Sequence, residues 1–274
     1  MSKKRDEHDV GLKFLQQAFG LSSLHFGLFT EDQPYNLENL RKAQVNYTST
    51  LVSLVPDGVK TVLDVGSGLG DISKVLIDRG YKVEGLSPDA YHGEKYLESC
   101  GKDAVFHLSK FEDFRTDTRY DCLLFGESPQ YIDKDAYFPK CLELTNPGSC
   151  IVLADFFQKH PGDVYPKCFV ESDFVARAEK AGFRVDYHRD ITKEVLPNLE
   201  VARLFLAYGQ KLFAFITDTL KRRKRFLWFL ANLFYGRRIR RVHQILHENS
   251  PKWLDSARFE ENMRYAMYRL VRPA

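Results

Sequence analysis

Thr61-Val-Leu-Asp-Val-Gly-Ser-Gly-Leu-Gly-Asp71 is the stretch that decides the fold. Its first five residues are mainly apolar, which predicts a short buried strand over 61–65. Glycines then occupy every second position, and a helix is expected from about residue 72. Glycine adopts backbone angles that other residues avoid and lets a ligand approach the main chain closely. In an open α/β sheet, such a turn lies at the carboxyl edge of the strands, where ligands bind.

The spacing of these glycines separates two kinds of nucleotide-derived ligand. A dinucleotide-binding turn needs Gly-x-Gly-x-x-Gly, and the third glycine position is Asp71 here. The pattern present is Asp-x-Gly-x-Gly-x-Gly, from Asp64 to Gly70. At the strand end, the Asp64 carboxylate can face a ligand and orient the turn. A purely structural turn is the alternative, and the preceding Val-Leu-Asp favours a ligand site.

Strand-like and helix-like segments alternate along the chain on both sides of this turn. Apolar strands are expected near residues 82–86, 104–108, 120–125, 150–155 and 183–188, and helices near 37–54, 90–100, 134–144 and 172–181. Such alternation predicts a mainly parallel, doubly wound α/β sheet. Phe259, Met263 and Met267 have the spacing of a last helix, and residues 265–272 fit either a helix or an edge strand.

The sequence divides into three predicted parts. Residues 1–55 are expected to form an N-terminal helical lid, with a weak helix over 12–19, and residues 56–198 the ligand-binding core. Residues 199–274 are expected to form a basic, aromatic-rich helical appendage together with the C-terminal end of the core. Most of the aromatic side chains, including the phenylalanines of 205–234, are expected in the core.

Charge is distributed unevenly along the 274 residues. The net charge is only +3, but residues 201–274 carry 16 Lys/Arg against 5 Asp/Glu. The clusters within 221–241 suit a solvated helix face, a contact with an anionic membrane surface, or recognition of an anionic substrate such as a diphosphate. Nucleic acid is not expected as a partner, because no recognition fold is evident.

The composition also bears on location and metals. The charged start of the sequence does not resemble a signal peptide, and the longest apolar run, 226–235, is too short to span a bilayer. The protein is therefore expected to be cytoplasmic, and a peripheral contact with a membrane is compatible with this expectation. The five cysteines have no metal-ligand spacing and are expected to be reduced, and no metal is predicted.

The Asp64–Gly70 pattern resembles the first motif of the class I S-adenosylmethionine (SAM) methyltransferases. The resemblance covers roughly residues 20–195 and is closest to the small-molecule branch with the sterol, tocopherol and geranyl diphosphate C-methyltransferases and the cyclopropane fatty acid synthases. Further stretches that carry it are Leu24-His-Phe-Gly-Leu-Phe29, Gly85-Leu-Ser-Pro88, Gly126-Glu-Ser-Pro-Gln-Tyr-Ile132 and Asp190-Ile-Thr192. It implies a Rossmann-like, doubly wound, mainly parallel seven-stranded sheet with an N-terminal lid and a C-terminal helical appendage.

The resemblance implies SAM as cofactor and S-adenosylhomocysteine as product. Family members usually hold the ribose with an acid after the second strand, where this chain has Leu86 and Ser87. The usual adenine-binding Asp falls on Lys110, and Phe111 would flank the adenine, with Glu112 or Asp113 accepting its hydrogen bond. The residues thus predicted to contact cofactor are Asp64, Gly66, Ser67, Gly68, Gly70, Leu86, Ser87, Lys110, Phe111, Gly126 and Tyr47.

Three residues are predicted to be catalytic. Glu127 follows the fourth strand, where the C-methyltransferases place a glutamate motif, and Tyr131 lies one turn later. Methyl transfer to an alkene carbon generates a carbocation, which a carboxylate can stabilise and deprotonate. The alternative for Glu127 is to cap a loop or bind the SAM amino group. His25 is a candidate base for O- or N-methylation, or a packing residue, and Asp155 either contacts substrate or caps a turn.

The function expected from these features is methyl transfer from SAM to a small, apolar acceptor, with C-methylation of an isoprenoid-like or polyketide-like molecule favoured. O- or N-methylation of a specialised metabolite is the alternative. A non-catalytic scaffold or lipid-surface module with this fold is a third interpretation. Neither the acceptor nor the oligomeric state follows from the sequence, since one fold hosts many chemistries.

Overall fold

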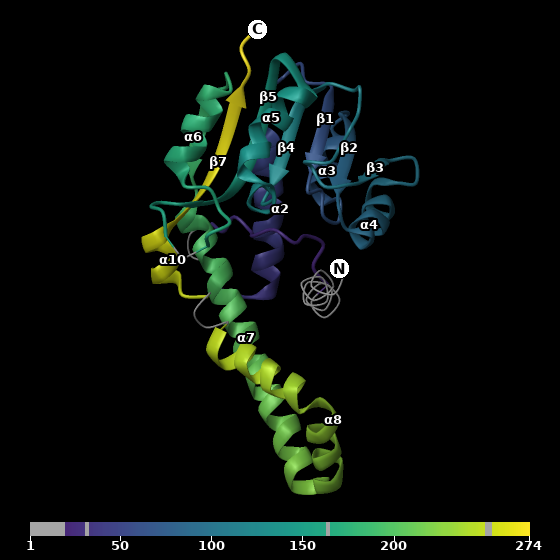
Figure 1. The fold of residues 1–274 in the computed structure, drawn as a ribbon, viewed down its shortest axis with the longest axis vertical. Coiled ribbons are helices and arrows are strands. Elements are labelled where there is room, and N and C mark those ends of the chain that lie inside the picture. Colours follow the sequence, from purple (N-terminus) through teal and green to yellow (C-terminus); the bar gives the residue numbers. More distant parts are fainter. Residues whose placement is uncertain (1–19, 31–32, 163–164, 250–253) are drawn as a thin grey trace.

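A seven-stranded sheet forms the centre of the computed structural model, which describes residues 20–30, 33–162, 165–249 and 254–274. The strand order is β3-β2-β1-β4-β5-β7-β6 (Figure 1). The strands are β1 Thr61–Val65, β2 Lys82–Ser87, β3 Val105–Leu108, β4 Tyr120–Gly126, β5 Thr145–Gln158, β6 Arg184–Asp190 and β7 Met263–Val271. The first five pair in parallel, which confirms the predicted doubly wound sheet.

Strand β7 corrects the prediction for the last segment. It is neither a helix nor an edge strand, because it runs antiparallel between β5 and β6. Met263 and Met267, which have helical spacing with Phe259, therefore lie on a strand, and α10 covers only Ser256–Asn262. Strand β7 is almost wholly buried, with Tyr265 and Leu270 inaccessible to solvent. A nearly continuous apolar run of this kind is typical of an interior strand, and periodicity alone does not distinguish it from a buried helix.

Helices cover both faces of the sheet. Side chains alternate along each strand, so Val62 and Leu124 pack toward one face while Leu63 and Leu123 pack toward the other. The first face is covered by α2 and α3, and the second by α5 and α6. The helices of the core are α2 Leu37–Ser53, α3 Asp71–Asp78, α4 Ala90–Cys100, the 3₁₀ turn η1 Pro129–Tyr131, α5 Lys134–Leu144 and α6 Glu171–Lys180.

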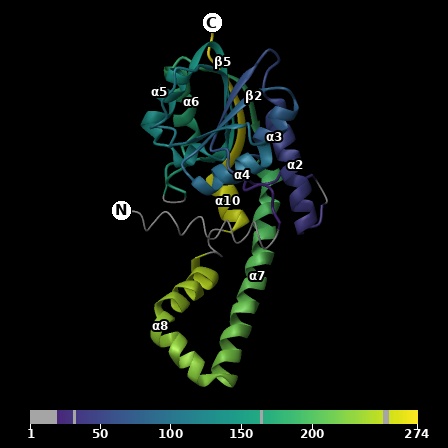
Figure 2. The same ribbon diagram turned by 90° about the vertical axis from the view of Figure 1, so that its right-hand side faces the viewer.

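A long helical hairpin projects from the core (Figures 1 and 2). It consists of α7 Thr192–Arg223, α8 Arg225–Gln244 and a π-helical turn, Ile245–Asn249. The predicted boundary at residue 198 falls inside α7, whose first turns pack on the sheet through Val195. The helix predicted over 12–19 lies outside the described residues.

The hairpin overturns the expectation that the phenylalanines of 205–234 are mostly core residues. Phe215, Phe226, Phe229 and Phe234 are 61–72% exposed. Their spacing is helical, but the two helices project away from the sheet and have mainly each other to pack against. Periodicity reports an apolar helix face and does not report what covers that face.

Candidate active site

The glycine turn between β1 and α3 has left-handed backbone angles at all three glycines. The φ angles of Gly66, Gly68 and Gly70 are +79°, +53° and +84°. The N–H groups of Gly66 and Ser67 donate to the carbonyl oxygen of Leu86, at 2.8 and 3.3 Å, and so fasten the turn to the end of β2. The three angles are those that favour glycine, and they explain the spacing in the sequence.

The first two glycines serve different purposes. A Cβ atom on Gly66 would lie 2.4 Å from the Cβ of Ser128, so this glycine allows β4 and the turn to pack closely. Around Gly68 the described residues leave open space: the atoms nearest to an added Cβ are the carbonyl oxygen of Gly66 and a methyl of Leu24, at 3.9 and 4.0 Å. Gly68 therefore exposes main chain to a ligand. Gly126 resembles Gly66, because a Cβ there would meet Ile72 at 2.7 Å.

Polar groups beside the turn differ in whether they are already bonded. The Ser67 hydroxyl is buried and has no hydrogen-bond partner among the described residues. The Ser87 hydroxyl lies 3.1 Å from Nδ1 of His92 and accepts the N–H of Asp89 at 3.3 Å, so it helps to begin α4. An unpartnered buried hydroxyl at the glycine turn is a feature that a polar ligand would satisfy.

The predicted adenine contacts lie on the loop after β3. Lys110 is exposed to solvent. Phe111 is buried and packs edge-on against Phe125, with ring centroids 5.4 Å apart, in the core cluster that also holds Tyr137. The Phe111 ring therefore packs in the protein core. Its contact with adenine stays a prediction, and core packing is the alternative role for this ring. Glu112 accepts the N–H of Asp133 at 2.9 Å.

Asp64 is buried beneath the turn. Its carboxylate accepts a hydrogen bond from the Ser73 hydroxyl at 2.6 Å, which ties β1 to α3. Burial raises the pKa of Asp64 to about 7, and the bond from Ser73 opposes that rise only in part. The carboxylate thus orients the turn from below, and its burial costs the folded state free energy at neutral pH.

Replacing Asp64 by asparagine is expected to raise the melting temperature by a few degrees at pH 8 and by little at pH 4. The folded pKa lies above the unfolded one, so the wild type loses stability as pH rises from about 4 to about 7. The stability of the asparagine variant should lack this dependence on pH, because its side chain does not titrate. Thermal unfolding from pH 4 to 8 measures the difference, with Asp113→Asn, an exposed carboxyl, as control. A difference in melting temperature between variant and wild type that stays constant from pH 4 to 8 would contradict the raised pKa of Asp64.

The N-terminal segment 20–30 crosses the glycine turn and is held there by hydrogen bonds. The Ser23 hydroxyl and the His25 imidazole both donate to Oδ2 of Asp71, at 2.6 and 2.8 Å. At its other end, Gly27 exchanges two hydrogen bonds with the side chain of Asn198 on α7, each 2.7 Å long. The segment is therefore clamped between the first residue of α3 and the base of the hairpin.

Both ring nitrogens of His25 have oxygen partners. Nδ1 lies 2.7 Å from the carbonyl of Phe26, and Nε2 lies 2.8 Å from Asp71 and 3.1 Å from the Thr48 hydroxyl. Burial lowers the pKa of His25, but the Asp71 carboxylate more than offsets that effect, and the net pKa is raised. The ring stacks on Tyr47 at 4.2 Å. These contacts favour an imidazolium that anchors the segment over a free base.

His25→Gln is expected to destabilise the protein by about 1.5–3 kcal/mol at pH 6, the value of a hydrogen bond to a charged group. A raised folded pKa gives stability that is fully present below the ordinary histidine pKa of 6.5 and is lost as pH rises through the folded pKa. The gap between wild type and variant should therefore narrow toward pH 9. Denaturant unfolding at several pH values measures it, with the exposed His160→Gln as control; a gap that widens contradicts the imidazolium.

Glu127 stands at the centre of a buried polar network at the end of β4. Its backbone is left-handed, with a φ of +56°, and Oε1 accepts hydrogen bonds from the Phe26 N–H at 2.6 Å and the Tyr265 hydroxyl at 2.7 Å. The hydroxyl of Tyr47 lies 3.0 Å from that of Tyr265. No described residue bonds Oε2, which leaves one carboxylate oxygen available. Left-handed angles at a non-glycine residue tend to occur at functional sites.

Two acids, Glu127 after β4 and Asp155 on β5, both have a raised pKa but have different hydrogen-bond partners. Burial raises the pKa of Glu127, and the positive His25 with the bonds from Tyr265 and Phe26 opposes the rise without cancelling it. Asp155 is buried, its pKa is well above the usual range for the same reason, and it accepts the N–H of Gln130 at 3.1 Å. Asp155 therefore caps the turn η1. Tyr131, on that turn, is 74% exposed and lies outside the network.

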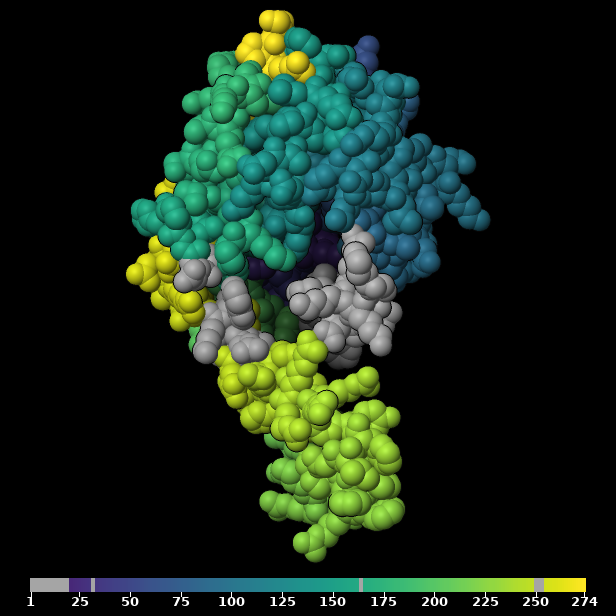
Figure 3. Space-filling model, in the orientation of Figure 1, coloured from purple at the N-terminus to yellow at the C-terminus, as the bar shows by residue number. Residues whose placement is uncertain are grey.

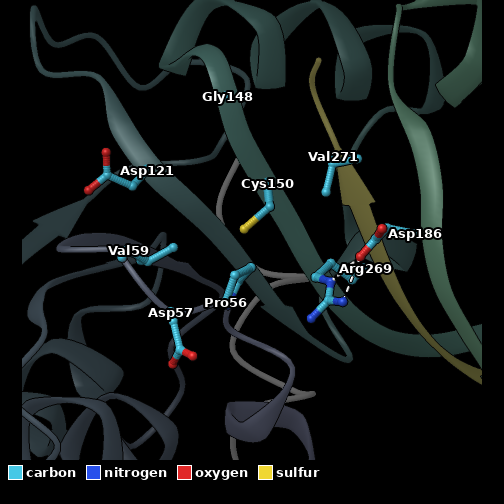
Figure 4. Close-up of a pocket in the computed structure, with 10 residues that line it drawn as sticks. Pro56, Asp57, Val59, Asp121, Gly148, Cys150, Asp186, Arg269 and Val271 are labelled. Carbon is cyan, nitrogen blue, oxygen red and sulfur yellow. Dashed lines mark hydrogen bonds and ion pairs between the residues drawn. The ribbon is translucent and has the colours of Figure 1, made fainter. Parts of the chain in front are cut away.

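A hollow opens below the carboxyl edge of the sheet in Figure 3, with purple surface of the N-terminal part and green surface of α7 at its back. A separate pocket of about 590 Å³ lies at the opposite edge, between the start of β1 and the end of β7 (Figure 4). Its main charged groups are satisfied by the protein: Arg269 pairs with Asp186 at 2.6 Å, and Asp121 accepts the N–H groups of residues 60 and 61. The candidate site is therefore the hollow at the carboxyl edge.

Three residues of the site are missing from the sequence-based set. Asp71 lies just after the last glycine, at the start of α3, and this position could have indicated from the sequence that it belongs to the site. Tyr265 and Asn198 come from β7 and α7, far along the chain from Glu127 and Gly27. No local pattern links these pairs.

The fold is the seven-stranded Rossmann-like fold of the class I methyltransferases. No protein-family model matches the sequence. An uncharacterized methyltransferase of Geobacillus kaustophilus (strain HTA426) is 28% identical over 197 residues, which cover 67% of this chain and 87% of that protein. The resemblance inferred from the sequence is therefore confirmed as a likeness to methyltransferases.

Two solved structures share the fold over nearly the whole chain. The [4+2]-cyclase SpnF has a TM-score of 0.69 at 15% identity, covering 98% of this chain and 94% of that one. Geranyl diphosphate C-methyltransferase from Streptomyces coelicolor A3(2), crystallised with Mg²⁺, geranyl diphosphate and S-adenosylhomocysteine, has a TM-score of 0.67 at 14% identity. It covers 94% of this chain and 92% of that one. At such identities the likeness concerns the fold alone.

Proposed function

We propose that this protein is a SAM-dependent methyltransferase of small molecules. The observation that carries the proposal is the turn at Gly66–Gly70, which has three left-handed glycines. Within the described ranges it also has an open approach at Gly68 and a buried Ser67 hydroxyl without a hydrogen-bond partner. The turn fits a ligand with polar groups that lies against main chain. The methyltransferase that is 28% identical supports SAM as that ligand, as does the S-adenosylhomocysteine in the Streptomyces C-methyltransferase structure.

The residues at the turn would hold SAM, which supplies an electrophilic methyl group when bound. Main chain at Gly68 and the Ser67 hydroxyl would bind its polar groups. Segment 20–30, clamped by Asp71 and Asn198, would exclude water from the site. Exclusion of water and correct positioning account for much of the acceleration of a displacement reaction.

Glu127 would act on the acceptor as the methyl group is transferred. In C-methylation, the acceptor carbon skeleton becomes positively charged and must lose a proton. The Glu127 carboxylate has one oxygen that no described residue bonds, a raised pKa and a position held by Phe26 and Tyr265. A raised pKa makes a carboxylate a better proton acceptor, so Glu127 fits both stabilisation of the cation and removal of the proton.

C-methylation of an apolar, isoprenoid-like or polyketide-like acceptor is therefore the reaction we favour. In O- or N-methylation the candidate base was His25, and both of its ring nitrogens already have oxygen partners. The aromatic rings near Glu127 suit an apolar acceptor: Phe156 packs against Tyr265 with centroids 4.6 Å apart, and Phe26 packs against Phe156 at 5.2 Å.

The first test is calorimetric binding of S-adenosylhomocysteine, which we expect in the micromolar range. Incubation with SAM labelled at the methyl group and a panel of prenyl diphosphates, isoprenoid quinols and polyketide thioesters should then give a product detected by mass spectrometry. Product labelled at carbon supports the favoured reaction, whereas label only at oxygen or nitrogen rejects it. No S-adenosylhomocysteine binding would reject the cofactor, and binding without any turnover would favour a scaffold.

A further inference from the structure

The hairpin α7–α8 exposes many large apolar side chains along its length. The exposed large apolar side chains on it, here called the hairpin surface, are Leu204, Tyr208, Leu212, Phe215, Ile216, Phe226, Leu227, Phe229, Leu233, Phe234, Tyr235, Val242 and Ile245. Large exposed apolar surfaces on soluble proteins mark interaction sites. The hairpin projects away from the core in both views (Figures 1 and 2), so the core does not cover this surface.

The same helices are strongly basic. Residues 204–245 contain ten Lys/Arg and a single acid, Asp218. Five of the cations form the run Lys221–Arg225 at the bend between the helices, farthest from the sheet (Figure 1), and four lie in 237–241. Among the described residues, no ion pair involves the run at the bend. The charge of that run is therefore available to a partner.

Cations and aromatic rings are interleaved at the bend and along the helices. The Lys221 ammonium lies 5.2 Å from the Trp228 ring, and Arg238 lies 5.8 Å from Tyr235. At a lipid headgroup layer, such rings enter the interface while the charged ends stay among the phosphates. Residues 221–230 have the sequence Lys-Arg-Arg-Lys-Arg-Phe-Leu-Trp-Phe-Leu, in which a cationic segment is directly followed by an apolar one.

We propose that the hairpin surface docks on an anionic lipid bilayer, with the bend 221–229 inserted into the headgroup layer. The anionic headgroups neutralise the basic run, and the interface covers the apolar side chains next to it, Phe226, Leu227 and Phe229. Basic residues alone or apolar side chains alone would not specify a lipid bilayer as the partner. The two together on one projecting hairpin favour it. No helix within the described ranges is long and apolar enough to cross a bilayer, so the contact is with one face of the membrane.

Two other partners fit the hairpin surface less well. A second copy of the chain would bring two hairpins, each with a net charge of +9 over 204–245, into contact and would leave the basic run at each bend uncompensated. A nucleic acid would neutralise the charge but would leave the apolar side chains that follow the basic run, such as Leu227, Phe229 and Leu233, exposed to water.

The proposal orients the candidate site. Helix α7 begins at the carboxyl edge of the sheet, where Asn198 holds the segment that crosses the glycine turn, and continues to the bend. The hollow in Figure 3 lies on the same side of the core as the hairpin. A docked hairpin would thus place the site opening toward the lipid surface, where apolar molecules are most concentrated.

Vesicle flotation with the full chain tests the proposal. We expect binding to phosphatidylcholine vesicles that contain about a third phosphatidylglycerol, and little binding to pure phosphatidylcholine. R222E/R223E/R225E should reduce partitioning at least about 100-fold, since each basic residue at an anionic surface contributes about fivefold. The matched control, K82E/K102E/K180E, changes three exposed cations on the core and should bind as wild type does. Brominated lipids should quench tryptophan fluorescence in wild type and markedly less in Trp228→Phe.

Several outcomes would overturn it. The proposal is wrong if wild type does not bind the anionic vesicles. It is also wrong if the core control loses as much vesicle binding as R222E/R223E/R225E does, or if R222E/R223E/R225E binds as well as wild type. A wild-type dimer in light scattering that F226S/F234S converts to a monomer would assign the surface to a second copy. Calorimetry of S-adenosylhomocysteine on the same variants separates this inference from the proposed function, because the bend lies far from the glycine turn and its variants should bind the ligand normally.

Discussion

Replacement of Gly68 by valine is expected to weaken S-adenosylhomocysteine binding at least about 100-fold, the equivalent of about 2.8 kcal/mol. The protein should still fold, because no atom of the described residues around it lies closer than 3.9 Å to a Cβ at this position. The added side chain would fill the open space through which a ligand reaches the main chain. Isothermal calorimetry of wild type and variant measures the loss directly.

The control for this experiment is Gly58→Val. Gly58 also has a left-handed backbone, with a φ of +90°, and the described part of the chain places no neighbouring atom within 4 Å of a Cβ there. It borders the pocket at the opposite edge of the sheet. Both variants should lose about 1–2 kcal/mol of stability from the backbone strain alone. Retained binding in Gly68→Val, or equal loss in both variants, would show that the ligand does not lie on this turn.

Glu127→Gln is expected to lower the rate of C-methylation by about 10²–10⁴-fold. The amide keeps an oxygen that can accept from the Phe26 N–H and the Tyr265 hydroxyl, so the local structure should persist. It cannot accept a proton or balance a positive charge on the acceptor. Single-turnover kinetics with labelled SAM and the acceptor found by screening measures the change.

Ligand affinity distinguishes the two roles considered for Glu127. If the carboxylate acts on the acceptor, S-adenosylhomocysteine should bind Glu127→Gln within about threefold of wild type; a large loss of affinity with a near-normal turnover rate would assign it to the SAM amino group. Asp103→Asn, an exposed carboxyl before β3 that is not among the predicted site residues, should change neither quantity.

The core of the fold was predictable because its signals are local. The strand before Gly66, the alternation of segments to residue 190 and the helix at 37–54 each depend on neighbouring residues, and the structure confirms them. Strand β7 was not predictable, since an interior strand and a buried helix share a continuous apolar run. The pairing that settles its nature joins residues more than 70 positions apart.

The candidate site divides in the same way. Glycine spacing identified the turn, and the position after β4 identified Glu127. The orientation of side chains did not follow: Asp64 turns to Ser73, Phe111 turns into the core, and His25 bonds Asp71. Each of these outcomes depends on burial and on a partner from another element, which a linear sequence does not display.

The insertion of β7 between β5 and β6 also has a consequence for synthesis of the protein. Within the described part of the chain, strand β6 pairs only with β7, and 72 residues separate Asp190 from Met263. At roughly 5–20 residues per second, a ribosome needs about 4–14 s to make that stretch. Throughout this interval β6 has no neighbour and one edge of β5 remains open. Nascent chains are therefore most prone to strand-mediated aggregation, and most in need of a chaperone, just before the last strand is made.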